Sequence, residues 1–319
     1  MPQTIIITGS VAYDYLMTFP GYFKEQILPD RLESISLSFL VDSMTRQRGG
    51  TAPNIAYSLA LLGGQPKLMA TVGEDFVEYR AWLERSGVNT ALTRVVPGKF
   101  TASFFATTDH ANAQIASFYP GAMAHAAELS FKGIEKPDLV VISPNDPAAM
   151  KSYAAECREL DIPYLYDPSQ QVLRLSGDEL TRDMQGAHFL FVNDYEYGLI
   201  EKKTGLDLAG ILDMVQVLVV TRGEKGASIY TDGQEIQVPV YPPERVLDPT
   251  GVGDAFRGGF LAGWQRGFDW QLCAQMGALA ATYCLEQTGT QNHTYTRSEF
   301  VQRFRQVFDD GGKLDALLR

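Results

Sequence analysis

Asp248-Pro-Thr-Gly-Val-Gly-Asp254 is the stretch that says most about the fold, because a helical pattern over Ala255–Phe260 follows it directly. Glycines at 251 and 253 leave backbone N–H groups free to point toward one spot. The positive end of the helix dipole lies at the same place. The stretch therefore predicts an anion-binding loop at the start of a helix.

Asp254 is negatively charged at a point where a bound phosphate would repel it, so it makes a poor phosphate ligand. It makes better sense as a general base that takes a proton from a hydroxyl attacking a phosphoryl group held by Gly251 and Gly253. The alternative is that Asp254 only caps the helix. The loop by itself leaves both interpretations open.

Short apolar runs upstream of this loop start 25 to 29 residues apart. They are Leu139–Ile142, Tyr164–Tyr166, Phe189–Val192 and Leu218–Thr221. Each interval leaves room for one helix, for example Ala148–Leu160, which is typical of successive βαβ units in a parallel sheet. The runs do not alternate with polar residues, as expected for strands covered on both faces.

Further elements complete a large α/β domain on the same reasoning. Ile5–Ile7 and Leu68–Val72 predict two more strands of the sheet. Helices are expected at Thr51–Leu62, with Pro53 in its first turn, at Ala255–Arg266, at Trp270–Glu286, and after a capping box formed by Thr296 and Glu299.

Two stretches interrupt this rhythm, Phe19–Arg48 and Thr93–Tyr119. Alternation such as Ser34–Phe39 predicts strands exposed on one face. We assign both stretches to a small β-sheet lid inserted into the main domain. The expected division is a large domain of residues 1–18, 49–92 and 120–319, and a lid of residues 19–48 and 93–119.

Composition excludes several functional classes. The 319 residues carry 27 basic and 38 acidic side chains, a net charge of −11, without a basic run. Binding to nucleic acid or to an anionic membrane surface is therefore not expected. The sequence contains no run of eighteen apolar residues, so a membrane-spanning helix is not expected. Cys157, Cys273 and Cys284 form no C-x-x-C pair, so we expect reduced thiols. The apolar run within Met1–Ile7 is too short for a signal segment, so we expect a cytoplasmic protein.

Four motifs together resemble those of the ribokinase-like (PfkB) carbohydrate and nucleoside kinases. Asp248–Asp254 resembles the D-x-T-G-A-G-D signature, with Val252 in place of alanine. Gly49-Gly50-Thr-Ala-Pro-Asn54 resembles the glycine pair followed by asparagine, Asn193–Glu196 the N-x-x-E motif, and Thr221–Gly226 the T-x-G-x-x-G loop. They occur in family order along the chain, and such a set is far more specific than one glycine pattern.

The resemblance implies a ribokinase-like fold, ATP as phosphate donor and Mg²⁺ as metal ion. It gives Asp254 the role of base, with Gly251 and Gly253 as the anion hole. It also implies that a monovalent cation such as K⁺ can assist beside that hole. Lid sheets pair between subunits in some family members, so the resemblance allows a homodimer through the lid.

The sugar site is expected beyond the first strand. Ser10 and Asp14 follow that strand, at the carboxyl end of a parallel sheet where ligands bind. A carboxylate there can accept two hydroxyls of a ribose, and the resemblance gives Asp14 this role, with Gly50 and Asn54 closing on the same sugar. Alternatively, Asp14 and Asn54 are turn and cap residues.

The donor side is expected around Asn193 and Glu196. These two side chains share one face at a helix start, and their oxygens suit a hydrated Mg²⁺ that bridges the donor phosphates. The alternative is a capping pair. Thr221, Gly223 and Gly226 form a loop after a strand, usable for donor phosphates or as a tight turn.

Five stretches are similar to bacterial adenosine kinases of the actinobacterial type: Thr8–Asp14, Ser36–Asp42, Gln114–Met123, Asp167–Gln171 and Thr288–Gln291. This similarity implies transfer of the ATP γ-phosphoryl group to the 5′-hydroxyl of adenosine, giving AMP and ADP, as in purine salvage. It further implies that Ser10, Ser38, Gln170 and Gln171 contact the nucleoside.

Aromatic residues of the lid segments could bind the base. Phe39, Phe104, Phe118 and Tyr119 lie there, and stacking of an aromatic ring on a purine contributes about 1 to 3 kcal/mol per base. The alternative is that these rings form only the core of the lid. We expect Phe104 and Phe118 to contact the purine.

Two rival functions remain. A sugar kinase acting on ribose or fructose would share every donor residue and differ in the lid, where aromatic residues favour a base. A non-catalytic nucleotide sensor is disfavoured by the intact set of Asp254, Gly253 and Asn54. The absence of G-x-x-x-x-G-K-[ST] and G-x-G-x-x-G motifs argues against a Walker P-loop and a nicotinamide enzyme.

Overall fold

A central sheet of eight strands organises the chain, whose computed structural model describes residues 3–28, 30, 33 and 36–319. The strand order is β14-β13-β12-β11-β10-β9-β1-β4. The bounds are β1 (Ile5–Thr8), β4 (Lys67–Met69), β9 (Leu139–Ile142), β10 (Tyr164–Tyr166), β11 (Phe189–Asn193), β12 (Val217–Thr221), β13 (Ala227–Thr231) and β14 (Gln234–Val238). Pairs from β4 to β12 are parallel, and β13 and β14 add an antiparallel edge. The predicted, mainly parallel sheet is confirmed.

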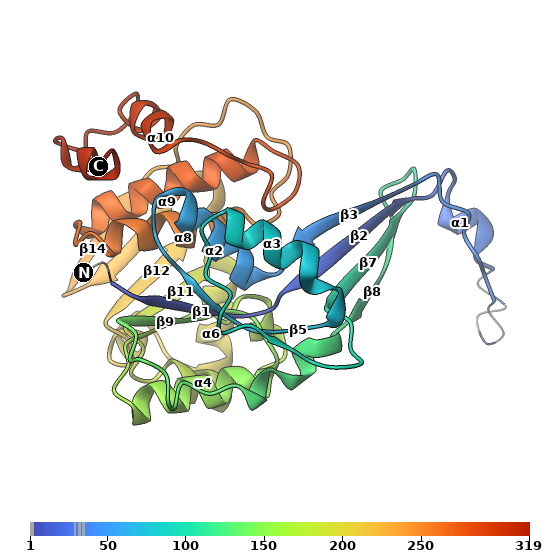
Figure 1. The fold of residues 1–319 in the computed structure, drawn as a ribbon, viewed down its shortest axis with the longest axis horizontal. Coiled ribbons are helices and arrows are strands. Elements are labelled where there is room, and N and C mark those ends of the chain that lie inside the picture. The colour runs from blue at the N-terminus through green and yellow to red at the C-terminus, as the bar shows by residue number, and fades with distance from the viewer. Residues whose placement is uncertain (1–2, 29, 31–32, 34–35) are drawn as a thin grey trace.

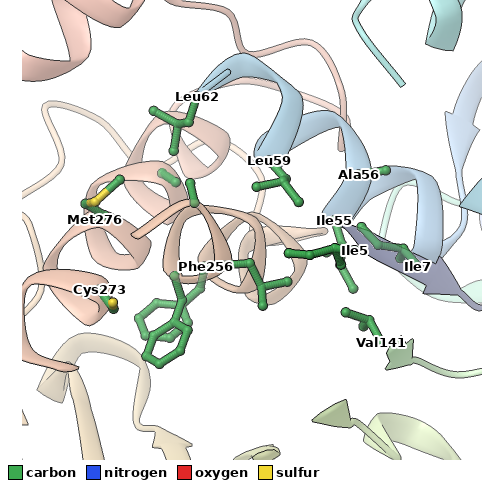
Figure 2. Packing of buried hydrophobic residues seen from close by; sticks show 14 of the residues in the cluster. Ile5, Ile7, Ile55, Ala56, Leu59, Leu62, Val141, Phe256, Cys273 and Met276 are labelled. Carbon is green, nitrogen blue, oxygen red and sulfur yellow. The ribbon is translucent and has the colours of Figure 1, made fainter. Parts of the chain in front are cut away.

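Helices cover both faces of this sheet, and for this reason its strands carry apolar residues on both sides (Figure 1). Ile5 and Ile7 belong to the core cluster on one face, and Ile6, between them, to the cluster on the other. The first face is covered by α2 (Thr51–Leu61), α8 (Val252–Trp264) and α9 (Trp270–Leu285). Figure 2 shows side chains of these helices packed toward Ile5, Ile7 and Val141.

The second face is covered by α4 (Pro147–Glu159), α5 (Gly177–Met184) and α6 (Asp194–Thr204). The remaining helices are α1 (Phe23–Gln26), α3 (Val77–Arg85), α7 (Leu208–Leu212) and α10 (Arg297–Phe304). The capping box expected before the last helix is present, with Thr296 and Glu299 bonded reciprocally. Among the described residues, the helices are too short or too polar to cross a membrane.

Two glycines place α8 tightly between α2 and α9. A Cβ atom at Gly258 would lie 2.6 Å from the Cβ of Ser58 in α2, and one at Gly259 would lie 2.6 Å from the carbonyl oxygen of Met276 in α9. Any larger residue would push the helices apart. The start of α8 is therefore held in a fixed position relative to the start of α2.

The strand expected over Leu68–Val72 is divided in two. Residues 67–69 form β4 of the central sheet, whereas β5 (Thr71–Val72) pairs with β6 (Arg94–Val95) in a separate two-stranded sheet. The chain thus leaves the central sheet at Ala70, whose carbonyl oxygen accepts a hydrogen bond from the Arg94 N–H.

A second sheet, which we call the lid sheet, has the order β3-β2-β7-β8 and extends away from the main body (Figure 1). Its strands are β2 (Ala12–Thr18), β3 (Ser43–Gly49), β7 (Ala102–Thr108) and β8 (Gln114–Tyr119). A small sheet beside the main domain was expected. The sequence-based division assigned residues 1–18 to the large domain, but β2 belongs to the lid sheet.

The strand expected over Ser34–Phe39 is wrong for the described residues of that stretch. Residues 36–42 form no strand, and residues 34 and 35 lie outside the described part of the chain. Pairing begins where the Asp42 N–H donates to the carbonyl oxygen of Thr18, at the end of β2, so residues 36–41 have no partner strand. Phe39 instead packs its ring against Phe19 and Phe23, with centroids 5.1 and 5.0 Å apart.

Candidate active site

The candidate residues gather where the carboxyl ends of the central strands meet the first turns of α2 and α8. Ser10 follows β1, Asp167 follows β10, and Asn193 ends β11. Ligands of open α/β sheets bind at this edge, because the loops there carry side chains that the sheet does not need for its core.

The glycine loop before α8 has the geometry of an anion-binding turn. Gly251 is the N-cap residue, with φ 78°, and no side chain caps the helix start. The loop is held by Asp248, whose carboxylate accepts hydrogen bonds from the N–H groups of Thr250 and Gly289, both at 2.9 Å. A Cβ at Gly253 would lie 2.9 Å from Nη1 of Arg257, so a side chain at this position would displace the guanidinium. The first N–H groups of α8 remain available to an anion.

Asp254 lies in the first turn of α8 but does not cap it. Its Oδ2 accepts a hydrogen bond of 2.9 Å from Nδ2 of Asn54, across the gap between α8 and α2. Removal of the carboxylate from water raises the pKa of Asp254 to about 6, although Arg257 and the Asn54 hydrogen bond oppose this rise. At neutral pH the group is therefore mostly ionised and still basic enough to take up a proton.

Arg257 and Asp167 form a buried ion pair that the sequence reasoning missed. Nη2 of Arg257 donates to Oδ1 of Asp167 at 2.8 Å, and Nε lies 2.6 Å from Oδ2. Burial raises the pKa of Asp167, and the guanidinium of Arg257 opposes that rise. Two signals could have found the pair. Arg257 lies three residues after Asp254, on the same helix face, and Asp167 directly follows a strand.

Asp14 lies in β2 beside the start of α2. A Cβ at Gly49 would lie 2.5 Å from Oδ2 of Asp14, and Gly50 turns the chain into α2 with φ 95°. Burial raises the pKa of Asp14 to about 6. Ser10 supports the same turn, because its Oγ accepts a hydrogen bond of 3.2 Å from the Thr51 N–H.

Asp14, Phe104 and Phe118 form one row across the lid sheet. Asp14 pairs with Phe104 between β2 and β7, and Phe104 pairs with Phe118 between β7 and β8. Directly opposite residues project from the same face of a sheet, so the carboxylate and both rings face one side. Phe118 is 48% exposed. Tyr119, its neighbour in β8, projects from the opposite face, so the structure does not bring it to this row.

The other residues that were expected to contact the nucleoside lie apart from this row. Ser38 is exposed and precedes β3, beyond the Thr18 end of β2, and Phe39 belongs to the aromatic cluster there. Thr18 lies about 13 Å along the strand from Asp14. After β10, Gln170 is exposed, whereas Gln171 is buried and donates to the carbonyl oxygen of Asn145 at 2.9 Å.

Asn193 and Glu196 form a complete capping box at the start of α6. Oδ1 of Asn193 accepts from the Glu196 N–H at 2.8 Å, and Oε2 of Glu196 accepts from the Asn193 N–H at 2.9 Å. The capping interpretation is therefore realised. It occupies one carboxylate oxygen of Glu196 and leaves Oε1 for a second partner.

The loop after β12 is a tight turn into the antiparallel strand β13. Gly223 and Gly226 have φ values of 54° and 85°, and a Cβ at Gly226 would lie 2.0 Å from the carbonyl oxygen of Val238. The hydroxyl of Thr221 donates to the carbonyl oxygen of Val192 at 3.5 Å. Both glycines are thus needed for the turn itself, which realises the tight-turn interpretation.

The residues present fit Mg²⁺ only as a partner of the donor phosphates. Within the described ranges there is no cluster of three His, Cys, Asp or Glu side chains that could hold a metal ion alone. A hydrated Mg²⁺ needs one or two carboxylates, with phosphate oxygens completing its shell. Glu196 offers such an oxygen, and its charge acts on Asp254, Asp167 and Arg257, so it lies near the glycine loop.

Two surface hollows lie elsewhere on the molecule. One, of about 720 Å³, is lined by residues that precede β11 and β12, among them His188 and Gln216. The other, of about 730 Å³, is lined by residues near the amino end of β4, among them Lys67 and Asn89. Neither contains a residue of the candidate site, which lies at the opposite ends of these strands.

Comparisons with known proteins find relatives along nearly the whole chain. The profile of the pfkB family carbohydrate kinases matches residues 9–297. A nucleoside kinase of Methanothermobacter thermautotrophicus is 31% identical over 95% of this chain and 96% of its own. The ligand-free structure of a Burkholderia thailandensis nucleoside kinase is 40% identical, with a TM-score of 0.86 over 94% of this chain and 99% of that chain. The same protein in complex with ADP-inosine is 39% identical, with a TM-score of 0.83 over 95% of this chain and 96% of that chain.

Proposed function

Because the chain belongs to the pfkB family of carbohydrate kinases, we propose that it transfers the γ-phosphoryl group of ATP to the 5′-hydroxyl of a nucleoside, with adenosine as the expected acceptor. The single observation that carries this proposal is the row of Asp14, Phe104 and Phe118 on one face of the lid sheet. A carboxylate beside two aromatic rings suits a sugar joined to a flat base. A free sugar would leave the rings without a partner.

The similarity to nucleoside kinases supports the same proposal. The Burkholderia thailandensis protein binds inosine together with ADP, and it shares the fold over nearly its whole length. The choice of adenosine within this class rests on the adenosine kinase-like stretches such as Asp167–Gln171 and Thr288–Gln291.

In the proposed reaction, Asp14 accepts hydrogen bonds from the two ribose hydroxyls, and Phe104 and Phe118 hold the base. The 5′-hydroxyl then reaches Asp254, which takes its proton as the oxygen forms a bond to the γ-phosphorus. The bond between that phosphorus and the leaving oxygen of ADP breaks in the same transfer. The products are the nucleoside 5′-monophosphate and ADP.

The charge that develops on the phosphoryl oxygens is met by the open N–H groups at the start of α8. Arg257 adds the positive charge of a guanidinium directly behind Gly253. When bound, Mg²⁺ supplies charge neutralisation of the donor phosphates, and Glu196 and Asn193 are the residues that would hold its hydration shell. Thr221, Gly223 and Gly226 border the donor side in this proposal.

Two further features follow from the family resemblance. K⁺ assists the reaction from beside the glycine loop, and two copies associate through their lid sheets. Strand β8 is exposed along its whole length at the edge of that sheet, which is what such pairing requires. Replacement of K⁺ by a large organic cation in the assay, and sedimentation of the purified protein, test these features separately.

The experiment that tests the proposed function is ADP release with ATP, Mg²⁺ and a panel of acceptors. The panel contains adenosine, inosine, guanosine, cytidine, uridine, ribose and fructose. We expect nucleosides to be phosphorylated about 5- to 150-fold more efficiently than free sugars, with adenosine first, since base stacking adds about 1 to 3 kcal/mol. Higher kcat/KM for ribose or fructose would favour the sugar kinase. ADP release without dependence on any acceptor would rule out a nucleoside kinase.

A further inference from the structure

A buried chain of side-chain hydrogen bonds leads from the edge of α3 to Asp254. The Nε1–H of Trp82 donates to Oε1 of Gln291 at 3.3 Å, and Nε2 of Gln291 donates to Oδ1 of Asn54 at 2.9 Å. Nδ2 of Asn54 then donates to Oδ2 of Asp254 at 2.9 Å. Gln291 is 2% exposed and Asn54 is 5% exposed, so water does not compete freely for these groups.

The direction of this chain is set at its outer end. An indole N–H can only donate, so it requires the oxygen of the Gln291 amide to face Trp82. The NH₂ group of Gln291 must then face inward, where its second N–H donates to the hydroxyl oxygen of Tyr79 at 2.5 Å. That hydroxyl donates its own proton to the carbonyl oxygen of Gly49 at 3.0 Å, so it is left to act as the acceptor.

An inward NH₂ group fixes the orientation of Asn54 in turn. The oxygen of the Asn54 amide faces Gln291, so its NH₂ group faces Asp254. In the reversed orientation, two NH₂ groups would meet at Gln291 and an amide oxygen would meet the Asp254 carboxylate. Either contact leaves buried polar groups without a hydrogen-bond partner, and each such group costs about 1 to 3 kcal/mol of folding free energy.

We propose that Gln291 is a positioning residue that keeps the NH₂ end of the Asn54 amide turned toward Asp254, under the control of the donor-only indole of Trp82. This inference rests on the proposed function only for the role of Asp254 as base. The residue does not touch the reacting atoms. It acts through Asn54, whose hydrogen bond stabilises the ionised form of the Asp254 carboxylate.

Other charged groups act on Asp254 and must stay unchanged for the test. They are Arg257 on the same helix and Glu196 at the start of α6. Asp167 after β10 and the Cys284 thiol of α9 also interact with its charge. Substitutions at Gln291 and Trp82 leave all four groups in place.

The test measures the titration of Asp254 directly, in protein labelled with ¹³C at the aspartate carboxyl carbons and without Mg²⁺ or nucleotide. Asp254→Asn assigns the resonance. We expect the midpoint to move upward in the order wild type, Gln291→Met, Gln291→Glu, by about one pH unit for the last variant, because its carboxylate presents an acceptor to Asn54 and adds a buried negative charge. Trp82→Phe keeps a ring at position 82 but frees the Gln291 amide to reverse, and it should also shift the midpoint upward.

Gln275→Met is the matched control, because Gln275 is also a buried glutamine but belongs to α9 and takes no part in this chain. Its midpoint should equal that of the wild type. Equal midpoints in wild type, Gln291→Met and Trp82→Phe would overturn the inference, even if the variants lose thermal stability. Because the titration needs no turnover, this outcome is distinct from a failure of the acceptor screen.

If Gln291→Glu does not fold, Gln291→Met and Trp82→Phe carry the comparison. In the active enzyme, the acidic limb of the kcat/KM profile should shift with the titration midpoint. A change in kcat/KM without movement of that limb would mean that Gln291 serves only to hold α2 in place.

Discussion

Arg257 contacts Asp167 through two of its nitrogens, with Nη2 2.8 Å from Oδ1 and Nε 2.6 Å from Oδ2, one helical turn beyond Asp254. The pair joins the helix that carries the glycine loop to the carboxyl end of β10. It also leaves Nη1 of Arg257 behind Gly253. The candidate base, the anion loop and the sheet edge are thus held together by one guanidinium.

Arg257→Met should destabilise the fold strongly, because it leaves the Asp167 carboxylate buried without a counter-charge. Loss of one partner of a buried ion pair costs about 3 to 5 kcal/mol. The double variant Arg257→Met, Asp167→Asn removes the orphaned charge and should recover a large part of that loss. Urea unfolding of the single and double variants measures the difference. A double variant less stable than Arg257→Met would contradict the role given to the pair.

Asp254→Asn should lower kcat by about 10² to 10⁴, the usual range for loss of a general base, because an amide cannot take up the hydroxyl proton. Binding of ATP should survive, since the N–H groups of the glycine loop are unchanged. Asp269→Asn is the control: Asp269 caps α9 through the Leu272 N–H, so its change affects stability and not turnover. Near-normal kcat in Asp254→Asn would mean that Asp254 is not the base.

The pH profile of kcat/KM should have an acidic limb near pH 6. Burial raises the pKa of both Asp254 and Asp14 to about 6, and each must be ionised to act, so activity is full above this value and falls below it. With two groups, the decline approaches about a hundredfold per pH unit, against about tenfold for one. Asp14→Asn should lower kcat/KM at all pH values, and its acidic limb should have the shallower slope expected for a single group. An unchanged slope would show that Asp14 does not titrate in this range.

Glu196→Gln should raise the Mg²⁺ concentration needed for half-maximal rate by about 10- to 100-fold, with the nucleoside KM nearly unchanged. The amide keeps an oxygen for the capping box but loses the charge that attracts the metal ion. Glu179→Gln alters an equivalent capping box, formed with Ser176 at the start of α5 and away from the candidate site. Equal Mg²⁺ titrations in the two variants would mean that Glu196 acts only as a capping residue.

Phe104→Ala and Phe118→Ala should each raise the nucleoside KM by about 5- to 150-fold and leave ATP binding unchanged, because a stacked base contributes about 1 to 3 kcal/mol. The effect falls on KM, since the base is remote from the reacting hydroxyl. Phe105→Ala is the matched control: Phe105 projects from the other face of β7 and stacks on Tyr15 at 4.8 Å. A similar KM rise in Phe105→Ala would mean that the rings support the lid and not the base.

The central sheet was predictable from the sequence because its strands are buried on both faces. Runs such as Leu139–Ile142 carry no polar residue that could suit another structure. The lid was harder: alternation at Ser34–Phe39 predicted a strand, but among the described residues of this segment the ones that pair with β2 are Ser43–Gly49. An alternating pattern shows which residues are suited to a strand. Whether they form one depends on how far the neighbouring strand extends, and β2 ends at Thr18.

The position of a candidate-site residue was predictable where one local motif holds it in sequence. Gly251, Gly253 and Asp254 are examples, and the structure brings them to one helix start. Arg257, Asp167 and Gln291 were missed as a set, because their contacts join segments that lie 90 and 237 residues apart. No local pattern records which buried side chains share a hydrogen bond over such separations.

The row of Asp14, Phe104 and Phe118 is built from two parts of the chain that lie far apart in the sequence. Asp14 lies on β2, which continues from β1 after three residues, whereas both rings lie on the hairpin of β7 and β8, which enters from a distant insertion. Under the proposed function, the residue that binds the sugar lies on the strand that follows β1, and the residues that contact the base lie on a hairpin whose β7 pairs with that strand. Side-chain changes on this face of 102–119 therefore alter the contacts to the base while Asp14 and Asp254 stay unchanged.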